Sequence, residues 1–205
     1  KSYVGFLIEG FYTKLNDAFV NEYADPQEDG IVYYIRTNAE NGAAVQGINM
    51  ELNWAPSARF SVKGGFTIQS SKYENPQEFD ERKFFRTPND YGYFVLDWAP
   101  YKKLGISSSG VYTGTMLIPY FGPEIPEYKE GELRESPGFF DLSFKVRYNI
   151  PINGATLQLF IGIKNAFNSY QSDFDRGLYR DPGYVYGPLN PRTVFFGLKF
   201  GNLIR

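Results

Sequence analysis

The feature that most constrains this chain is an alternation of apolar and polar residues with a period of two. The clearest stretch places Leu157, Leu159, Ile161 and Ile163 on one face and Thr156, Gln158, Phe160, Gly162 and Lys164 on the other. Successive side chains of a β-strand point to opposite faces, so this stretch predicts a strand with one apolar and one mostly polar face. No segment shows a convincing helical period, and we therefore expect an all-β chain.

The same alternation recurs in about eight segments. We expect strands near Tyr3 to Leu15, ending at Trp54, beginning at Phe60, ending at Trp98, from Leu104 to Thr115, from Phe140 to Tyr148, from Thr156 to Lys164 and from Thr193 to Phe200. The first of these and the segment from Leu104 to Thr115 alternate less cleanly than the rest. Nothing in the composition divides the 205 residues, so residues 1–205 are expected to form one domain.

The connections between these segments are of two kinds. Three are short, at residues 55–58, 99–103 and 149–154, and contain Pro or Asn-Gly, which favour turns. Between them lie four connections of roughly twenty residues, longer than the loops of globular proteins usually are. Short and long connections alternate, as in a membrane barrel with short periplasmic turns and long extracellular loops, whereas a soluble sandwich has no reason for this order. The pattern favours an antiparallel transmembrane β-barrel segment whose C-terminus lies in the periplasm.

Three large aromatic residues support this interpretation. Trp54, Trp98 and Tyr148 each lie on the apolar face just before a short connection, where a ring would reach the lipid headgroups. Aromatic residues also occur at strand ends of other β-proteins, and three coincidences are the alternative explanation. The positions therefore add to the prediction without deciding it.

Composition excludes several function classes. The chain has no Cys and no His. This composition excludes a cysteine nucleophile, a Ser-His-Asp relay and metal sites with thiolate or imidazole ligands, and no enzyme is expected. The net charge of −2 is spread along the chain and offers no basic field for nucleic acid. No stretch approaches the roughly 20 apolar residues of a membrane helix, so any membrane span must be β. Residues 1–4 resemble neither a signal segment nor a cleavage site, and we expect a mature chain or a fragment.

Several local sequences resemble landmarks of the C-terminal third of TonB-dependent outer-membrane receptors. Asn41 followed by residues 47–52 is similar to the glycine-hydrophobic-glutamate strand of this family, with Asn49 in place of the first Glu. Residues 162–168 are similar to the Asn-Leu-Phe-Asn element that closes the penultimate strand, with Ala166 in place of Leu. Residues 191–193 lead into a last strand like that of the family, although family chains usually end at the aromatic residue, here Phe200.

The resemblance implies a larger protein in the Gram-negative outer membrane. Family barrels have about 22 strands and a lumen plugged by an N-terminal domain. The resemblance therefore implies that residues 1–205 are the C-terminal portion of the barrel, without the plug, the N-terminal strands or the segment that contacts TonB. The implied partners are the remainder of the barrel, the plug, TonB, outer-membrane lipid and a surface lipoprotein. Residues 1–15 and 193–200 are expected to pair with polypeptide outside this chain, because exposed strand edges promote aggregation.

The polar face of the strands carries charges of both signs. We expect the following residues to face the lumen: Glu9, Glu51, Lys63, Asp97, Asp141, Lys145, Arg147, Lys164 and Lys199. The resemblance implies that such residues face the plug and trapped water. A hydrated wall that needs polar groups whatever its partner is the alternative.

The long connections contain the candidate ligand-binding residues. The last one holds Asp173, Asp175, Arg176, Tyr179, Arg180, Asp181, Tyr184 and Tyr186, which offer aromatic faces and charge to a polar ligand. The third holds an acidic cluster of Glu124, Glu127, Glu130, Glu132 and Glu135, which would attract a cationic cargo. Ordinary solvated loops are the alternative in both cases. Asp173 and Asp175 have a spacing compatible with calcium, but six or more oxygens are needed, so no metal or cofactor is expected.

Two functions remain open at this point. The first is import of a scarce nutrient, such as a ferric siderophore, cobalamin or an oligosaccharide, by a TonB-dependent receptor. The second is a structural or adhesive role for a small closed barrel, since eight strands suffice for a barrel whose interior is filled by side chains. An outer-membrane enzyme would lack a credible pair of nucleophile and base.

Overall fold

A computed structural model describes residues 2–23, 33–125 and 131–202. The elements are β1 (Tyr3–Leu15), β2 (Phe19–Tyr23), β3 (Tyr34–Asn38), β4 (Ala43–Ser57), β5 (Phe60–Tyr73), the 3-10 helix η1 (Glu78–Asp80), β6 (Asp90–Tyr101), β7 (Leu104–Thr113), β8 (Leu117–Tyr120), β9 (Glu132–Glu135), β10 (Phe139–Ile152), β11 (Ala155–Lys164) and β12 (Thr193–Gly201). In this part of the chain no helix is long and apolar enough to cross a membrane.

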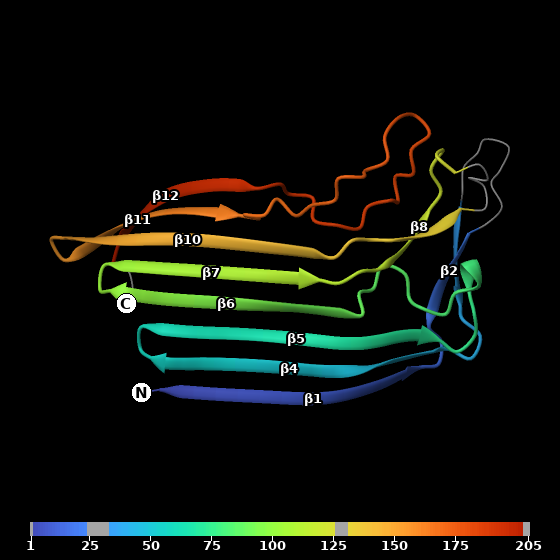
Figure 1. The fold of residues 1–205 in the computed structure, drawn as a ribbon, viewed down its shortest axis with the longest axis horizontal. Helices are drawn as coiled ribbons and strands as arrows, with labels where there is room; N and C mark the ends of the chain where they lie inside the picture. The colour runs from blue at the N-terminus through green and yellow to red at the C-terminus, as the bar shows by residue number, and fades with distance from the viewer. Residues whose placement is uncertain (1, 24–32, 126–130, 203–205) are drawn as a thin grey trace.

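Eight strands form one antiparallel sheet in the order β1-β4-β5-β6-β7-β10-β11-β12. These are the eight strands expected from the alternation, with different ends. β7 ends at Thr113 and not at Thr115, β12 ends at Gly201 and not at Phe200, and β10 runs from Phe139 to Ile152 and not from Phe140 to Tyr148. Each strand pairs with the next one of the sheet along the chain, and all the short turns lie at one end (Figure 1). The four long connections lie at the opposite end, as the order of short and long connections predicts.

The register keeps each face of the sheet uniform across the strands. Ile161 is the partner of Val146 on β10 and of Phe196 on β12, and all three belong to the apolar set. Gly162, one residue further, is the partner of Lys145 and Phe195 on the opposite face. A shift of one residue would exchange the two faces, so the alternation fixes this pairing. We call the face with Ile161 the outer face and the face with Lys145 the inner face.

The three short turns are tighter than predicted. The sequence suggested four to six residues, but the strands continue past Trp54, Trp98 and Tyr148 and leave two residues in each turn. Asn153 and Gly154 have φ of 43° and 84°, the left-handed pair that a type I′ hairpin requires. Pro56 and Pro100 were expected to lie in turns, but each lies within a strand at a bulge, where the register shifts by one residue. A bulge leaves one backbone N–H unpaired, so a proline, which has no N–H, is tolerated there.

The long connections contain structure that the sequence did not predict. β2 pairs with β3 in the first connection, and β8 pairs with β9 in the third. These strands have only four or five residues, and β8 contains Pro119, so neither hairpin has the length of alternation that marks the main strands. We call the four long connections together the loop layer.

The main sheet is open. β1 and β12 lie at its two edges and do not pair with each other, although both are fully described. Phe6 on β1 and Phe196 on β12 are 64% and 84% exposed, which leaves large apolar side chains at both edges. A small closed eight-stranded barrel requires these edges to pair, so the open topology disfavours that alternative.

Candidate functional site

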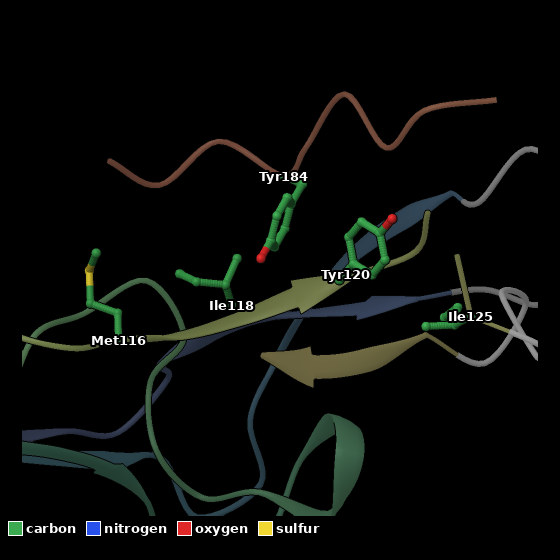
Figure 2. Packing of buried hydrophobic residues seen from close by; sticks show 5 residues of the cluster. All are labelled: Met116, Ile118, Tyr120, Ile125 and Tyr184. Carbon is green, nitrogen blue, oxygen red and sulfur yellow. The ribbon is translucent and has the colours of Figure 1, made fainter. Parts of the chain in front are cut away.

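The buried core of the described chain lies in the loop layer. Figure 2 shows the cluster that Met116, Ile118, Tyr120, Ile125 and Tyr184 form, with Ile118 and Tyr120 almost fully buried. The rings of Tyr120 and Tyr184 meet edge to face with their centroids 4.7 Å apart. The cluster joins the β8-β9 hairpin of the third connection to the last connection, two segments that are far apart in the sequence.

A charged group covers this cluster. The guanidinium carbon of Arg134 on β9 lies 3.6 Å from the centroid of the Tyr120 ring, a cation–π contact. The same guanidinium forms salt bridges with Glu132 at 2.5 Å and Glu124 at 3.5 Å. Part of the predicted acidic cluster is therefore paired with a cation. Glu135 ends β9, and Glu127 and Glu130 lie outside the described residues.

Three of the predicted ligand-binding residues contact one another. The Tyr186 hydroxyl donates to the two carboxylate oxygens of Asp173 at 2.6 and 2.7 Å, and the Tyr184 hydroxyl donates to Asp173 at 3.1 Å. Burial and the nearby Asp173 carboxylate raise the pKa of both tyrosines, because the phenolate would lose hydration beside a negative charge. Asp173 therefore holds two neutral phenols in place.

Two further acids of the last connection bind backbone groups. Asp175 accepts hydrogen bonds from the N–H groups of Arg176 and Asp181 at 2.9 and 2.6 Å. Asp181 in turn accepts from the N–H groups of Phe121 and Gly183 at 3.0 and 2.7 Å. The carboxylates of Asp173 and Asp175 thus serve different partners. Among the described residues no group of three or more acids is arranged to hold a metal ion.

Arg176, Tyr179 and Arg180 are exposed, and we call the exposed residues 176–180 the tip of the last connection. Tyr179 is 80% exposed, and its neighbour Leu178 is 85% exposed. The Arg180 side chain donates to the Gly177 carbonyl at 3.1 Å and remains exposed. The sequence grouped these three residues with Tyr184 and Tyr186, but the structure divides them into an exposed tip and a packed base.

Arg86 links three of the long connections and was not among the residues predicted from the sequence. Its guanidinium donates to the carbonyls of Val185 and Gly183 at 2.8 and 2.6 Å, and its backbone N–H donates to the Leu117 carbonyl at 2.9 Å. Arg86 has φ of 56°, a left-handed conformation that a non-glycine residue adopts only when its contacts hold it there. Those contacts are long-range, and no local motif indicated them.

A cavity of about 280 Å³ lies between the first and second long connections. Its lining includes Phe19, Arg36, Tyr73, Phe84, Phe85 and Arg86. The rings of Tyr73 and Phe84 lie 4.5 Å apart, and the Tyr73 hydroxyl donates to the Phe19 carbonyl at 3.0 Å. Two guanidinium groups beside aromatic rings suit an anionic ligand with a planar part. The run Lys83-Phe84-Phe85-Arg86 was the available sequence signal for this cavity.

The inner face holds all the predicted lumen residues, as the strand register shows. Asp97 accepts a hydrogen bond from Ser107 at 2.6 Å, and Arg147 donates to Ser107 at 3.2 Å and lies 3.8 Å from Asp97. Further along the sheet Lys145 lies over the Phe160 ring at 4.9 Å, and Lys164 lies over Phe195 at 5.9 Å. Remaining members of the inner-face set are Glu9, Glu51, Lys63, Asp141 and Lys199. The wall is thus polar, with cations over aromatic rings on its β10 to β12 side.

Asn165 fixes the end of β11, in the segment that resembles the family element. Its buried carboxamide donates to the carbonyls of Ser169 and Asn190 at 3.0 and 2.9 Å and accepts from the Ser169 N–H at 2.8 Å. Its backbone N–H donates to Asp141 at 3.1 Å, so this inner-face acid also helps to hold the strand end. One side chain therefore joins the beginning and the end of the last long connection.

These features define the wall of an outer-membrane-type β-barrel: the sheet is antiparallel and open, one of its faces is apolar and the other polar, and the short turns lie at the end opposite the packed loop layer. The family model described as "TonB dependent receptor-like, beta-barrel" matches residues 3–166, and the chain belongs to this family. A search of curated proteins finds no match.

Solved receptors share the fold over nearly the whole chain. The ferric-catecholate import receptor Fiu from E. coli K12 has 17% identity and a TM-score of 0.60 over 96% of this chain and 25% of its own. The copper transporter OprC has 15% identity and a TM-score of 0.64 over 98% and 30% of the two chains. The siderophore receptor PirA from Acinetobacter baumannii has 12% identity and a TM-score of 0.63 over 97% and 29%. The chain therefore spans between a quarter and a third of the receptors that it resembles.

Proposed function

We propose that this chain forms part of the barrel wall of a TonB-dependent receptor that imports a scarce nutrient across the outer membrane. The observation that carries the proposal is the family membership together with a packed loop layer at one end of the sheet. Cargo binds in the loop layer and passes through a lumen that a plug domain gates, without covalent chemistry, so the protein is a transporter and not an enzyme.

The loop cavity favours a ferric siderophore over an oligosaccharide as the cargo. Arg36 and Arg86 line a cavity that also contains aromatic rings. The Arg86 guanidinium already donates to the Val185 and Gly183 carbonyls, so Arg36 is the group that we expect to bind a carboxylate or phenolate oxygen, in the bidentate geometry that guanidinium groups favour. Anionic iron chelates offer such oxygens, whereas a neutral oligosaccharide does not. Two of the solved proteins that share this fold are a ferric-catecholate import receptor and a siderophore receptor, which agrees with this choice.

The last connection contributes a second contact in this proposal. Tyr184, Tyr186 and Asp173 form the packed base, and Arg176, Tyr179 and Arg180 at the exposed tip are the groups that meet cargo first. Asp175 holds the connection between tip and base through its bonds to backbone N–H groups. The packed base limits the motion of the tip before cargo binds, so less conformational entropy is lost on binding.

The inner face and the two edges of the sheet are assigned to the rest of the receptor. We place the plug domain and its hydration water against Glu51, Lys63, Lys145 and the other inner-face charges. The open edges at β1 and β12 are proposed to pair with the remaining strands of the barrel, which would satisfy their free backbone groups.

Uptake of a radioactive ferric siderophore by cells that express the full-length receptor tests this function. We expect uptake to disappear when the receptor is deleted and also when TonB is deleted, because transport needs energy from the inner membrane. The cells are tested with a panel of catecholate, hydroxamate and carboxylate siderophores. If deletion of the receptor changes the uptake of none of these ferric siderophores, the proposal is contradicted.

A matched pair of substitutions tests the cavity. Arg36→Gln removes a cation from the cavity, and Arg59→Gln removes one from the exposed short turn between β4 and β5. Loss of one charge-assisted contact costs about 1.5–3 kcal/mol, so we expect Arg36→Gln to raise the Kd of the transported siderophore about tenfold or more. Arg59→Gln should leave it unchanged, and equal effects would remove the cavity from the proposal.

A further inference from the structure

Three lysines lie in one row on the outer face, at the end of the sheet near the loop layer. Lys14 on β1 is the partner of Ala44, and Ala44 is in turn the partner of Lys72 on β5. Lys83 continues the row, because it forms an antiparallel bridge with Lys72. All three lysines are exposed. Side chains of bridge partners lie on the same face, so three ammonium groups line this edge of the outer face.

The rows below the lysines become less polar towards the middle of the sheet. The next row holds Tyr12, Gln46 and Ser70, and the row below that holds Gly10, Ile48 and Ile68. Ile48 and Ile68 are 48% and 52% exposed, so this apolar row is open to its surroundings. Rows on one face are about 7 Å apart along the strand. The face therefore changes from charged to hydrogen-bonding to apolar over about 14 Å.

Two hollows adjoin the lysine row. One of about 160 Å³ is lined by Ala44, Gln46, Ser70, Lys72, Glu74 and Arg82. The other, of about 510 Å³, is lined by Lys14, Asn16, Asn41, Glu74 and Asn75, and three carboxamides make it polar. Lysine and arginine beside serine and glutamine offer donors to phosphate oxygens, and the asparagines suit the hydroxyl groups of a headgroup.

The charge balance around the row favours an anion. Within the described residues Lys14, Lys72 and Lys83 form no salt bridge; Glu74 lines both hollows, and Lys72 and Lys83 act electrostatically on Glu81. Glu81 accepts hydrogen bonds from the backbone N–H groups of Arg82 and Lys83, so its carboxylate is partly occupied. Arg82, which lines the smaller hollow, adds a fourth cation, and like charges in one row repel unless an anion lies between them.

We infer that this face binds a lipid with a phosphate- and hydroxyl-bearing headgroup in the leaflet next to the loop layer. The phosphate lies at Lys72 and Lys14, the polar linkage lies along Gln46 and Ser70, and an acyl chain lies over Ile48 and Ile68. A soluble phosphate would leave the apolar row uncovered, which is why a lipid fits better. The inference rests on the outer face meeting the membrane, and it does not depend on which cargo is transported.

Native mass spectrometry of the full-length receptor in detergent tests the site with phosphatidylglycerol as the probe. The test pair is Lys14→Gln with Lys72→Gln, and the control pair is Lys102→Gln with Lys103→Gln in the short turn between β6 and β7. We expect the test pair to reduce phosphatidylglycerol binding about tenfold and the control pair to leave it unchanged. Lys14→Arg with Lys72→Arg keeps both charges and should restore binding, which separates lost charge from a folding defect.

Three results would overturn the inference. Equal losses in the test and control pairs would mean that any lysine attracts the lipid. Equal binding of phosphatidylcholine would mean that the lysines do not select an anionic headgroup. Displacement of phosphatidylglycerol by inorganic phosphate at millimolar concentration would identify a site for free phosphate. None of these results would bear on siderophore uptake, so failure of this inference is distinguishable from failure of the transport proposal.

Discussion

The sheet and the loop layer differ in where they bury side chains. In the eight strands of the sheet most large apolar residues of the outer face remain exposed, among them Phe196, Leu198 and Ile161. In the loop layer Ile118, Tyr120 and Tyr184 are buried in a cluster of their own. The sheet has no core of its own and leaves its apolar outer face open, whereas the loop layer is held together by its own contacts. The two regions should therefore respond differently to the same kind of change.

The largest expected effect is at the centre of the loop cluster. Tyr120→Ala should destabilise the packing of the loop layer by about 3–5 kcal/mol, because it removes a buried ring and leaves a cavity under Arg134. Hydrogen exchange of the full receptor should show faster exchange in residues 116–125 and 171–187, with the sheet unchanged. Faster exchange in the sheet as well would show that the two regions are one cooperative unit.

A lysine placed on each face of β6 compares the two faces directly. Leu96→Lys puts a charge on the outer face and should destabilise the folded receptor in lipid vesicles by about 2–4 kcal/mol, measured by urea unfolding. Val95→Lys, one residue away on the inner face, should cost little, since we propose that water lies against that face. Equal losses for both substitutions would contradict the assignment of the faces.

Alkaline pH should loosen the loop layer before the sheet. The pKa values of Tyr120, Tyr184 and Tyr186 are all raised above the ordinary value of 10.0, chiefly by burial. The folded loops hold the protonated phenols, so the stability that they confer is complete below pH 10.0 and is lost as the pH rises through the folded pKa values. Limited proteolysis between about pH 8 and pH 11 should show cleavage in the last connection first.

Tyr186→Phe provides the control for this experiment, because it removes one ionising group and keeps the ring. The pH response of the last connection should become weaker in this variant, although its stability at neutral pH falls with the loss of the bonds to Asp173. An unchanged pH response would place its origin outside the tyrosine cluster.

The smallest expected effect is at a short turn. Gly154 has φ of 84°, so Gly154→Ala should cost about 1 kcal/mol by forcing a side chain into the left-handed region. The cost should appear in the unfolding of the whole sheet and not in the loop layer. Gly10→Ala on β1 is the matched control, since a Cβ there meets nothing within 4 Å and φ is not positive.

The sheet was predictable because its information is local. Alternation along Thr156 to Lys164 fixes which residues share a face. Ile161 therefore pairs with an apolar residue, Val146, and the next residue, Gly162, pairs with Lys145 on the opposite face. The turns were predicted less well, because Pro56 and Pro100 indicate a turn by composition but lie in bulges within the strands. Local pattern therefore locates strands better than it locates their ends.

For the loop layer, the sequence indicated candidate residues but not the contacts between them. Asp173, Tyr184 and Tyr186 were singled out as candidate ligand-binding residues, a role that stays a prediction, and nothing in the sequence indicated that they would hydrogen-bond to each other. Arg86 was missed, because its partners Gly183 and Val185 lie 97 and 99 residues away along the chain. Contacts of this kind depend on how the sheet brings loop ends together, and that is a property of the fold.

The claim that the sheet separates lipid from a hydrated lumen is tested most directly by nitroxide scanning of residues 157–164 in the full receptor reconstituted in bilayers. The 205 residues contain no Cys, so single Cys residues can be introduced in this segment one at a time, after any Cys in the rest of the receptor has been replaced by Ser. We predict collision with oxygen to peak at residues 157, 159, 161 and 163, and collision with a water-soluble nickel complex to peak at residues 158, 160, 162 and 164. Equal access of the nickel complex to all eight positions would contradict a membrane wall.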